Sequence, residues 1–228
     1  MKFCVVIPIH NEAEYIAGVV AAVREYGMDI IVVDDGSTDE SARLAGEAGA
    51  RVLRRPARSG KGATLRHGFA HALAENYDGV ITMDGDGQHL AQDLPAFLEA
   101  ARACPVGIIS GSRMRDVRAM PLVRLWTNRV MSVLISHLCR QRIPDTQCGF
   151  RYIHCDILRK VSLESSEFQI ETEVLVQASR AGYPISSVDI STIYAGEHSK
   201  INPLRDTLNF LRYYLREIFR RNKQKEKA

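Results

Sequence analysis

The chain has 228 residues, of which 46% are hydrophobic and 25% charged, with a formal net charge of +3. This balance excludes a disordered or fibrous protein and fits one globular domain, with or without a short appendage. No stretch reaches the roughly 18 consecutive apolar residues of a membrane-spanning helix. The N-terminal apolar run soon meets polar residues and does not continue as a signal peptide, so we expect a cytoplasmic protein. The five cysteines are scattered without a CxxC pair, which predicts reduced thiols.

Short apolar strands alternate with helices through the first half of the chain. The strands are expected at residues 3–9, 30–33, 51–53, 80–83 and 106–110. The helices are expected at residues 14–26, from near 37–40 onward, at 61–74 and at 90–103. Strands of this length separated by helices predict a parallel sheet that is covered by helices on both faces.

The second half is less regular. Residues 121–139 predict a helix with a broad apolar face, and residues 149–154 and 185–194 predict two strands. A helix is expected between these strands at residues 171–181, where Glu171 and Glu173 should not both face inward. A last helix is expected at residues 202–222.

The C-terminal segment is basic. Residues 201–228 hold eight lysines and arginines against three acidic residues, a net charge of +5, whereas the first 200 residues carry −2. Its amphipathic spacing is typical of a helix at a membrane surface, with Tyr213 and Tyr214 at headgroup level. The alternative is a helix packed on the body with solvated arginines. No nucleic-acid-binding module is present, so no nucleic-acid partner is expected.

Polar clusters follow three of the predicted strands, at residues 10–12, 34–37 and 84–89. The carboxyl ends of parallel strands meet at one edge of a sheet, so these clusters should converge on one crevice. The chain has neither the GxGxxG dinucleotide fingerprint nor the GxxxxGK[ST] phosphate loop. A dehydrogenase or a P-loop enzyme therefore has no motif in its favour.

The sharpest chemical feature is the acidic turn that contains Asp84, Asp86 and Gln88. Two carboxylates and an amide at alternate positions offer hard oxygen ligands, and the glycines between them allow a tight turn. Such ligands suit Mg²⁺ or Mn²⁺, which are commonly shared with substrate phosphates.

These motifs resemble those of the GT-A family 2 glycosyltransferases, and more closely the polyprenyl-phosphate hexose synthases of the dolichol-phosphate mannose and glucose type. The resemblance spans nearly the whole chain, at residues 5–12, 31–39, 60–69, 83–89, 111–113, 145–151 and 171–190. It implies a GT-A α/β fold with a mostly parallel sheet at residues 1–200 and a basic amphipathic helix and tail at 201–228. The DTQCGF spelling at 145–150 is nearer the glucose synthases, but this one difference leaves glucose and mannose open.

The resemblance also implies roles on the donor side of the site. A divalent ion, Mg²⁺ or Mn²⁺, would be held by Asp84, Asp86 and Gln88 against the diphosphate of a UDP- or GDP-hexose. The donor would further contact Pro8, His10, Glu12, Asp35, Asp84 and Lys200.

On the acceptor side, Arg124 and Asn128 lie one helical turn apart and would receive the acceptor phosphate. Asn128 stands where the family more often has serine. The groups expected to act directly in catalysis are Asp86, Arg113 and Arg124.

The implied reaction is metal-dependent, inverting transfer of a hexose to polyprenyl phosphate. The phosphate acceptor is already anionic, so its attack needs no general base. An enzyme on this lipid would lie peripherally on the inner face of the membrane. Two alternatives remain: a GT-A transferase that acts on a soluble acceptor, and a non-catalytic module that binds sugar nucleotides.

Overall fold

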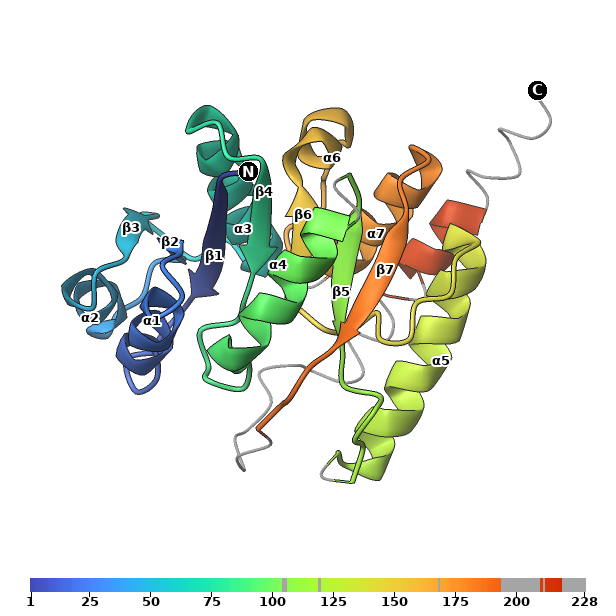
Figure 1. The fold of residues 1–228 in the computed structure, drawn as a ribbon, viewed down its shortest axis with the longest axis horizontal. Helices are drawn as coiled ribbons and strands as arrows, with labels where there is room; N and C mark the ends of the chain where they lie inside the picture. Colours follow the sequence, from blue (N-terminus) through green and yellow to red (C-terminus); the bar gives the residue numbers. More distant parts are fainter. Residues whose placement is uncertain (104–105, 119, 168, 194–209, 211, 219–228) are drawn as a thin grey trace.

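The computed structural model describes residues 1–103, 106–118, 120–167, 169–193, 210 and 212–218. Within these residues, strands form a seven-stranded sheet in the order β3-β2-β1-β4-β6-β5-β7 (Figure 1). The strands are β1 (Phe3–Ile9), β2 (Asp29–Asp34), β3 (Arg51–Arg54), β4 (Gly79–Thr82), β5 (Ile108–Ser112), β6 (Arg151–His154) and β7 (Ile185–Asp189). The helices are α1 (Ile16–Arg24), α2 (Ser41–Glu47), α3 (Lys61–Ala74), α4 (Leu94–Ala103), α5 (Leu122–Cys139), α6 (Cys155–Lys160) and α7 (Gln169–Arg180).

The predicted parallel sheet is confirmed with one exception. Strands β3, β2, β1 and β4 are parallel to their neighbours, as are β5 and β7, but β6 runs antiparallel between β4 and β5. Residues 147–149, just before β6, lie beside the cavity at the carboxyl edge of the sheet. The chain therefore enters β6 from that edge and has to run back across the sheet. The sequence pattern also missed the short helix α6.

Two apolar cores cover the two faces of the sheet. Side chains alternate along β1, so that Cys4 and Val6 join a core with α3, α5, α6 and α7. Val5 and Ile7 join the other core, with α1 and α4. Every residue of β4 is buried, as expected for a central strand covered on both faces. The sheet is thus a rigid base for the loops at its carboxyl edge.

The described part of the C-terminal segment packs on the body. Residues 212–218 are helical, Phe210 and Tyr213 are buried in the core with α7, and Arg180 forms an ion pair with the buried Glu217. Tyr213 is therefore not at a lipid headgroup level, whereas Leu215 of the same helix is half exposed. The predicted boundary at residue 200 lies outside the described residues. No helix among the described residues is long and apolar enough to span a bilayer.

Candidate active site

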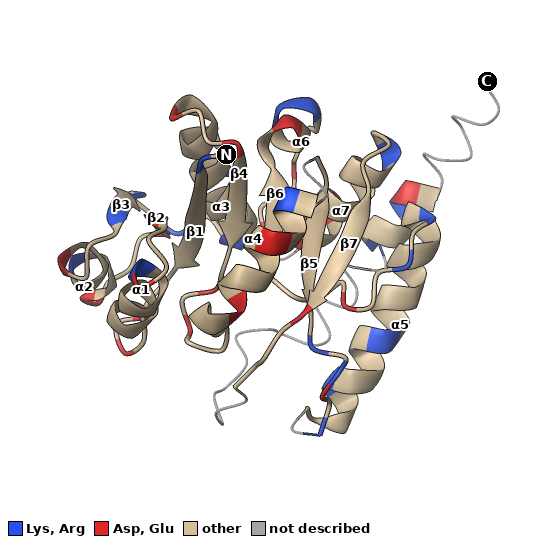
Figure 2. Cartoon of the chain, viewed as in Figure 1, with Lys and Arg blue, Asp and Glu red and all other residues tan. Residues whose placement is uncertain are grey.

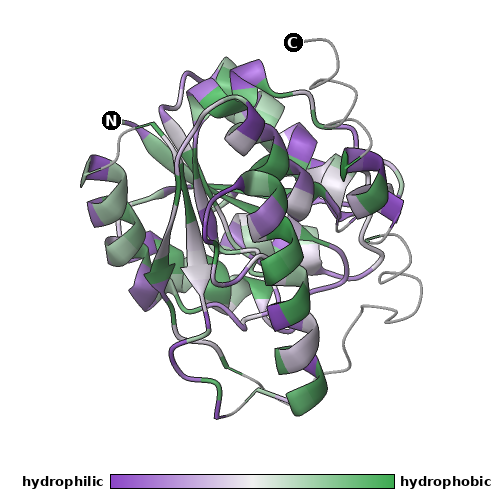
Figure 3. Ribbon diagram, turned by 90° about the vertical axis from the view of Figure 1, so that its right-hand side faces the viewer, coloured by the Kyte–Doolittle hydropathy of each residue, from purple (hydrophilic) through white to green (hydrophobic). Residues whose placement is uncertain are grey.

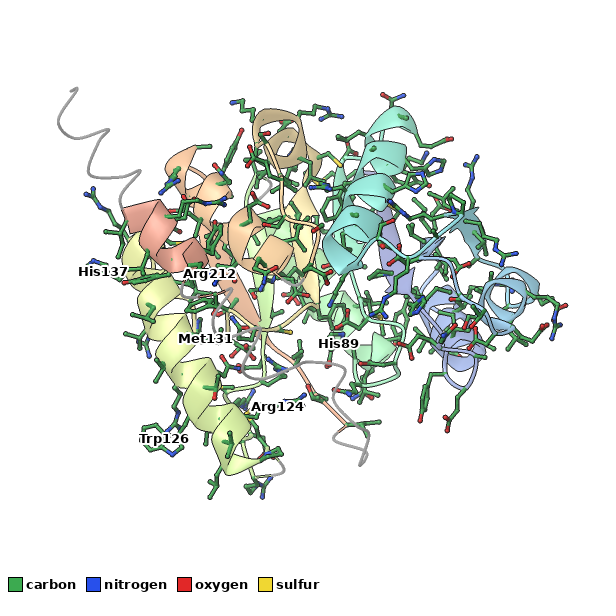
Figure 4. All side chains as sticks on the ribbon, turned by 180° about the vertical axis from the view of Figure 1, so that it is seen from behind. His89, Arg124, Trp126, Met131, His137 and Arg212 are labelled. Carbon is green, nitrogen blue, oxygen red and sulfur yellow. The ribbon has the colours of Figure 1, made fainter. Side chains whose placement is uncertain are left out.

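The polar clusters predicted to converge do meet, in one cavity of about 230 Å³. It lies beyond the carboxyl ends of β1, β2 and β4, where the strand order switches direction and ligands of open α/β sheets bind. Its lining includes the predicted residues Pro8, His10, Glu12, Asp35, Asp84, Asp86, Gln88, Arg113 and Arg124. Figure 4 shows Arg124 on the side of α5 that is turned toward His89.

The acidic turn follows β4 and is closely packed beneath. A Cβ on Gly85 would lie 2.7 Å from Cγ2 of Ile9, so a larger residue would displace the turn from β1. Within the turn, Oδ1 of Asp86 accepts a hydrogen bond of 3.0 Å from the backbone N–H of Gln88. Burial, and then the neighbouring charge of Asp84, raise the pKa of Asp86 to about 6. Two carboxylates are thus held in the cavity at an electrostatic cost.

Lys61 compensates the negative charge of one of these carboxylates. It was not among the site residues predicted from the sequence. Its Nζ lies 2.6 Å from Oδ1 of Asp84 and 2.7 Å from Oε1 of Glu171. Burial by itself lowers the pKa of Lys61 and raises that of Asp84. Their mutual attraction, with Glu171 added for the lysine, reverses both effects, so the pKa of Lys61 is raised and that of Asp84 is lowered. The GKG triplet at residues 60–62, which spans the start of α3 and has no Walker spacing, was the available signal in the sequence.

His89 supports the acidic turn from behind. Its Nδ1 accepts a hydrogen bond of 3.2 Å from the backbone N–H of Asp84, which assigns the proton of the neutral ring to Nε2. Burial outweighs the attraction of Asp84 and lowers the pKa of His89 to about 4. The ring is therefore neutral at physiological pH and acts as a fixed acceptor that orients the turn.

The residues after β1 and β2 that are predicted to contact the donor are joined by hydrogen bonds. His10 Nδ1 lies 2.9 Å from the backbone oxygen of Asp35, and the Asp35 carboxylate accepts hydrogen bonds from the N–H groups of Ser59 and Gly60. Gly36 has φ +66°, and a Cβ there would lie 2.9 Å from the backbone of Ala57. Asp35 therefore closes the loop before α3 while it lines the cavity.

The residues of the acidic turn fit a divalent cation by their chemistry. Asp86 is half-buried beside a second carboxylate, and desolvation together with the charge of Asp84 raises its pKa, so a bound cation would stabilise its charged form. Among the described residues no group of three His, Cys, Asp or Glu side chains forms a metal centre by itself. Mg²⁺ and Mn²⁺ sites commonly use one or two carboxylates and take the remaining ligands from water and substrate phosphates. Asp84, Asp86 and the amide of Gln88 suit such a site.

The cationic side of the cavity is built around Arg113, which follows β5. Its Nε and Nη2 donate to the two oxygens of Asp145, at 2.7 and 3.0 Å, in a bidentate pair. Asp145 is fully buried and also accepts from Nδ2 of Asn128 at 2.9 Å. Ser132 in turn donates to Oδ1 of Asn128, at 2.9 Å. Burial raises the pKa of Asp145, but the Arg113 pair more than reverses this and lowers it.

Asn128 and Arg124 do not share a face toward the cavity, contrary to the prediction. Arg124 lines the cavity, whereas Asn128 is only 2% exposed. The amide of Asn128 donates a hydrogen bond to Asp145 and accepts one from Ser132. The reason is the position of α5: Asn128 lies on the helix face that packs on the body. Its contacts make it a positioning residue for Asp145. Lys200, predicted near the donor phosphates, lies outside the described residues.

The expectation for Glu171 and Glu173 is wrong. Both are withdrawn from solvent, because α7 is surrounded by structure on more than one side. Glu171 lines the cavity and pairs with Lys61, while Glu173, 2% exposed, accepts hydrogen bonds from the N–H groups of Glu164 and Ser165. Glu173 thereby fixes the loop that leads into α7.

Cys148 packs beneath the site. It is fully buried, burial raises its pKa to about 12, and its Sγ lies 4.0 Å from Nε2 of His89. A thiol with such a pKa stays protonated and is a poor nucleophile.

The sheet order, the cavity at its carboxyl edge and the acidic turn after β4 define a glycosyltransferase of the GT-A fold. A solved structure with this fold, glucosyl-3-phosphoglycerate synthase from Mycobacterium tuberculosis in complex with Mn²⁺, UDP and glucosyl-3-phosphoglycerate, is 19% identical. It aligns with a TM-score of 0.72 over 96% of this chain and 79% of its own.

The sequence comparisons identify the family. The model of glycosyl transferase family 2 matches residues 4–162. Glycosyltransferase AglJ of Haloferax volcanii is 32% identical, over 93% of this chain and 71% of its own length. The undecaprenyl-phosphate mannosyltransferase of Micrococcus luteus is 27% identical, over 85% of this chain and 84% of its own. The chain belongs to glycosyl transferase family 2.

Proposed function

We propose that this enzyme transfers a hexose from a nucleoside-diphosphate sugar to a polyprenyl phosphate at a membrane surface. The observation that carries the proposal is the division of charge in the cavity: Asp84 and Asp86 line it together with Arg113 and Arg124. A cation at the carboxylates suits a donor diphosphate, and the arginines suit a second phosphate. The mannosyltransferase relative is named for transfer to such a lipid phosphate.

In the proposed reaction, an oxygen of the acceptor phosphate attacks the anomeric carbon of the hexose. The new C–O bond forms as the bond to the donor diphosphate breaks, and the nucleoside diphosphate leaves with the electron pair. Attack opposite the leaving group inverts the anomeric centre. A bound Mg²⁺ or Mn²⁺ supplies Lewis acidity for the charge that develops on the diphosphate.

The chain's own residues position the two anionic substrates. Pro8, His10, Glu12 and Asp35 line the donor end, and UDP- and GDP-hexoses are both candidates. Arg113 is held rigidly by Asp145, so it meets phosphate charge without reorganising. Arg124 approaches from α5 and binds the acceptor phosphate. No proton has to be removed from the nucleophile.

Transfer to a hydroxyl group of a soluble acceptor is the second candidate, and it requires a general base. Glu167 lines the cavity and is the observation in its favour. An assay that offers a short-chain prenyl phosphate and, separately, soluble sugar acceptors decides between the two. Transfer to the phosphate alone supports our proposal, whereas transfer to hydroxyl acceptors alone contradicts it.

Replacement of Asp86 tests the metal-dependent chemistry. We expect Asp86→Asn to lower the rate of hexose transfer in Mn²⁺ by at least about 100-fold, since a preorganised charge at the departing group is lost. Glu99→Gln, an exposed acid on α4, removes the same charge away from the cavity and should keep wild-type activity. A fully active Asp86→Asn enzyme would remove the acidic turn from the mechanism.

A further inference from the structure

Helix α5 exposes a continuous apolar surface. Ten large hydrophobic residues are exposed in the described part of the chain, and half of them lie on this helix. We call these five residues the apolar stripe: Leu122, Val123, Trp126, Val130 and Val133, which are 54 to 80% exposed. Figure 3 shows hydrophobic residues along the length of α5. Single exposed hydrophobics are ordinary, but a contiguous stripe marks an interaction surface.

The predicted broad apolar face of this helix is in fact two faces. Leu125, Ile135 and Leu138 are buried, as helix packing requires. The stripe lies on the outer side, where Figure 4 shows Trp126 pointing away from the body. Residues 122, 126, 130 and 133 recur at helical spacing and so line up along that side. Packing within the chain therefore explains one half of the apolar residues of α5 and leaves the other half unexplained.

A groove lined by arginines borders the stripe. Arg129, Arg140 and Arg142 line an open hollow of about 590 Å³, to which Val133 of the stripe also belongs. Among the residues that the structure describes, no acidic residue lines the hollow, and α5 contains none (Figure 2). Within the described part of the chain, these three arginines form no ion pair. By contrast, the nearby Arg115 and Arg118 each face an aspartate.

We propose that α5 is the surface by which this enzyme docks on an anionic lipid bilayer. The apolar stripe enters the boundary between headgroups and acyl chains, with Trp126 at the interface, and the arginine groove binds lipid phosphates. An amphipathic helix with an aromatic and aliphatic face flanked by arginines has this preference. A second copy of the chain fits less well, because a two-fold contact through the stripe would bring two uncompensated arginine grooves together.

Docking through α5 also orients the active site. Arg124 lies on the same helix and lines the catalytic cavity, so the cavity opens close to the docked surface. The phosphate of a polyprenyl phosphate lies at the headgroup level of a bilayer. This step rests on the proposed function, whereas the docking itself rests on the stripe and the groove. The surface differs from the C-terminal helix, whose described residues Phe210 and Tyr213 pack on the body.

The protein carries its own reporter for this surface, because Trp126 is its single tryptophan. The full chain is titrated with vesicles of phosphatidylcholine, with and without phosphatidylglycerol. We expect the emission of Trp126 to shift to shorter wavelength, and its quenching by acrylamide to fall, with the anionic vesicles. Sedimentation of the same samples measures the bound fraction.

Two double variants separate the stripe from the groove, and both keep Trp126. Val130→Glu with Val133→Glu should weaken vesicle partition by about tenfold or more, since charges replace buried apolar groups. Arg129→Gln with Arg142→Gln should weaken it by roughly 25-fold, taking about fivefold per arginine. The matched controls are Tyr26→Glu for the stripe and Arg102→Gln for the groove, and both should bind as wild type. Leu215→Glu tests the C-terminal helix and should also leave binding unchanged.

Three results would overturn the proposal. The first is no change in Trp126 emission with anionic vesicles, and the second is sedimentation with vesicles while the emission stays that of an exposed indole. The third is a shift that depends on protein concentration without vesicles, which would assign the stripe to a second copy. Hexose transfer to a water-soluble short-chain prenyl phosphate should be unaffected in the Val130→Glu, Val133→Glu variant. If the wild-type enzyme transfers no hexose to that acceptor, the proposed function is refuted, whereas the vesicle-binding result still stands.

Discussion

The two sides of the cavity are built by different means. On the acidic side, Glu12, Asp35, Asp84 and Asp86 project from loops that directly follow strands β1, β2 and β4. On the cationic side, Arg113 is held by a second layer of buried polar residues that come from elsewhere in the sequence. The first arrangement is set by sheet topology, whereas the second depends on a hydrogen-bond network.

This difference predicts how each side responds to change. When a residue on a loop at a strand end is replaced, only the contact of its own side chain is lost, because the strand still holds the loop in place. A member of the buried network also holds other members, so its replacement should affect activity and stability together. The cluster on the cationic side, Arg113, Asp145 and Asn128, should therefore be the more sensitive to substitution.

The largest effect is expected for Asp145→Asn. The substitution keeps the volume but removes the charge that holds Arg113, leaving a guanidinium that is 11% exposed without its counterion. Breaking a buried ion pair costs about 3 kcal/mol or more of unfolding free energy. We expect a loss of that size in urea denaturation, together with a fall of at least about 100-fold in hexose transfer as Arg113 loses its orientation.

Asp189→Asn is the matched control, because Asp189 forms an exposed pair with Arg115 at 3.5 Å. Its effect should stay below about 1 kcal/mol. The pKa of Asp145 is lowered in the fold, so its stabilisation is present above the unfolded pKa of about 3.9 and is lost as pH falls below that value through the folded pKa. Asp145→Asn should lack this acid dependence. Equal losses of stability in the two variants would contradict the assignment of Asp145 to a buried network that holds Arg113.

A smaller and more selective effect is expected for Arg124→Gln. Arg124 approaches the cavity from α5 and is proposed to bind the acceptor phosphate. Loss of one charge-assisted hydrogen bond is worth roughly 1.5–3 kcal/mol, so the KM for a short-chain prenyl phosphate should rise about 10- to 100-fold. Nucleotide affinity, measured by calorimetry, should not change. A weaker nucleotide affinity with an unchanged acceptor KM would place Arg124 on the donor side instead.

The sequence was most informative where function follows from strand position. The expected strands 3–9, 30–33 and 80–83 place the polar residues that follow them at one edge of the sheet. The helix expected at 61–74 is found at its predicted bounds. The direction of β6 was missed, because a short apolar strand carries no signal of its partner or orientation. Lys61 was missed for a related reason: its contacts with Asp84 and Glu171 join residues far apart in the chain.

Helical periodicity had a different limit. It placed α5 correctly but did not show which apolar residues face the body and which face outward, because both sets have the same spacing. The same ambiguity affected α7, where Glu171 and Glu173 are both withdrawn from solvent on a helix enclosed from several directions. Burial depends on what packs against a helix, and the helix sequence by itself does not specify it.

The smallest effect, and the sharpest test of the comparison, is expected for Asn128→Ala. The amide of Asn128 donates to Asp145 and is not part of the cavity lining, so its loss should lower the unfolding free energy by about 1 kcal/mol. The kcat should fall modestly as Asp145 and Arg113 gain freedom, while the acceptor KM stays near that of wild type. Asn128→Ser, which introduces the residue more frequent in the family, is the second variant. If Asn128→Ala raised the acceptor KM as Arg124→Gln is expected to do, Asn128 would contact the acceptor phosphate. Asn128 would then belong to the cavity lining and not to the layer of residues that supports it.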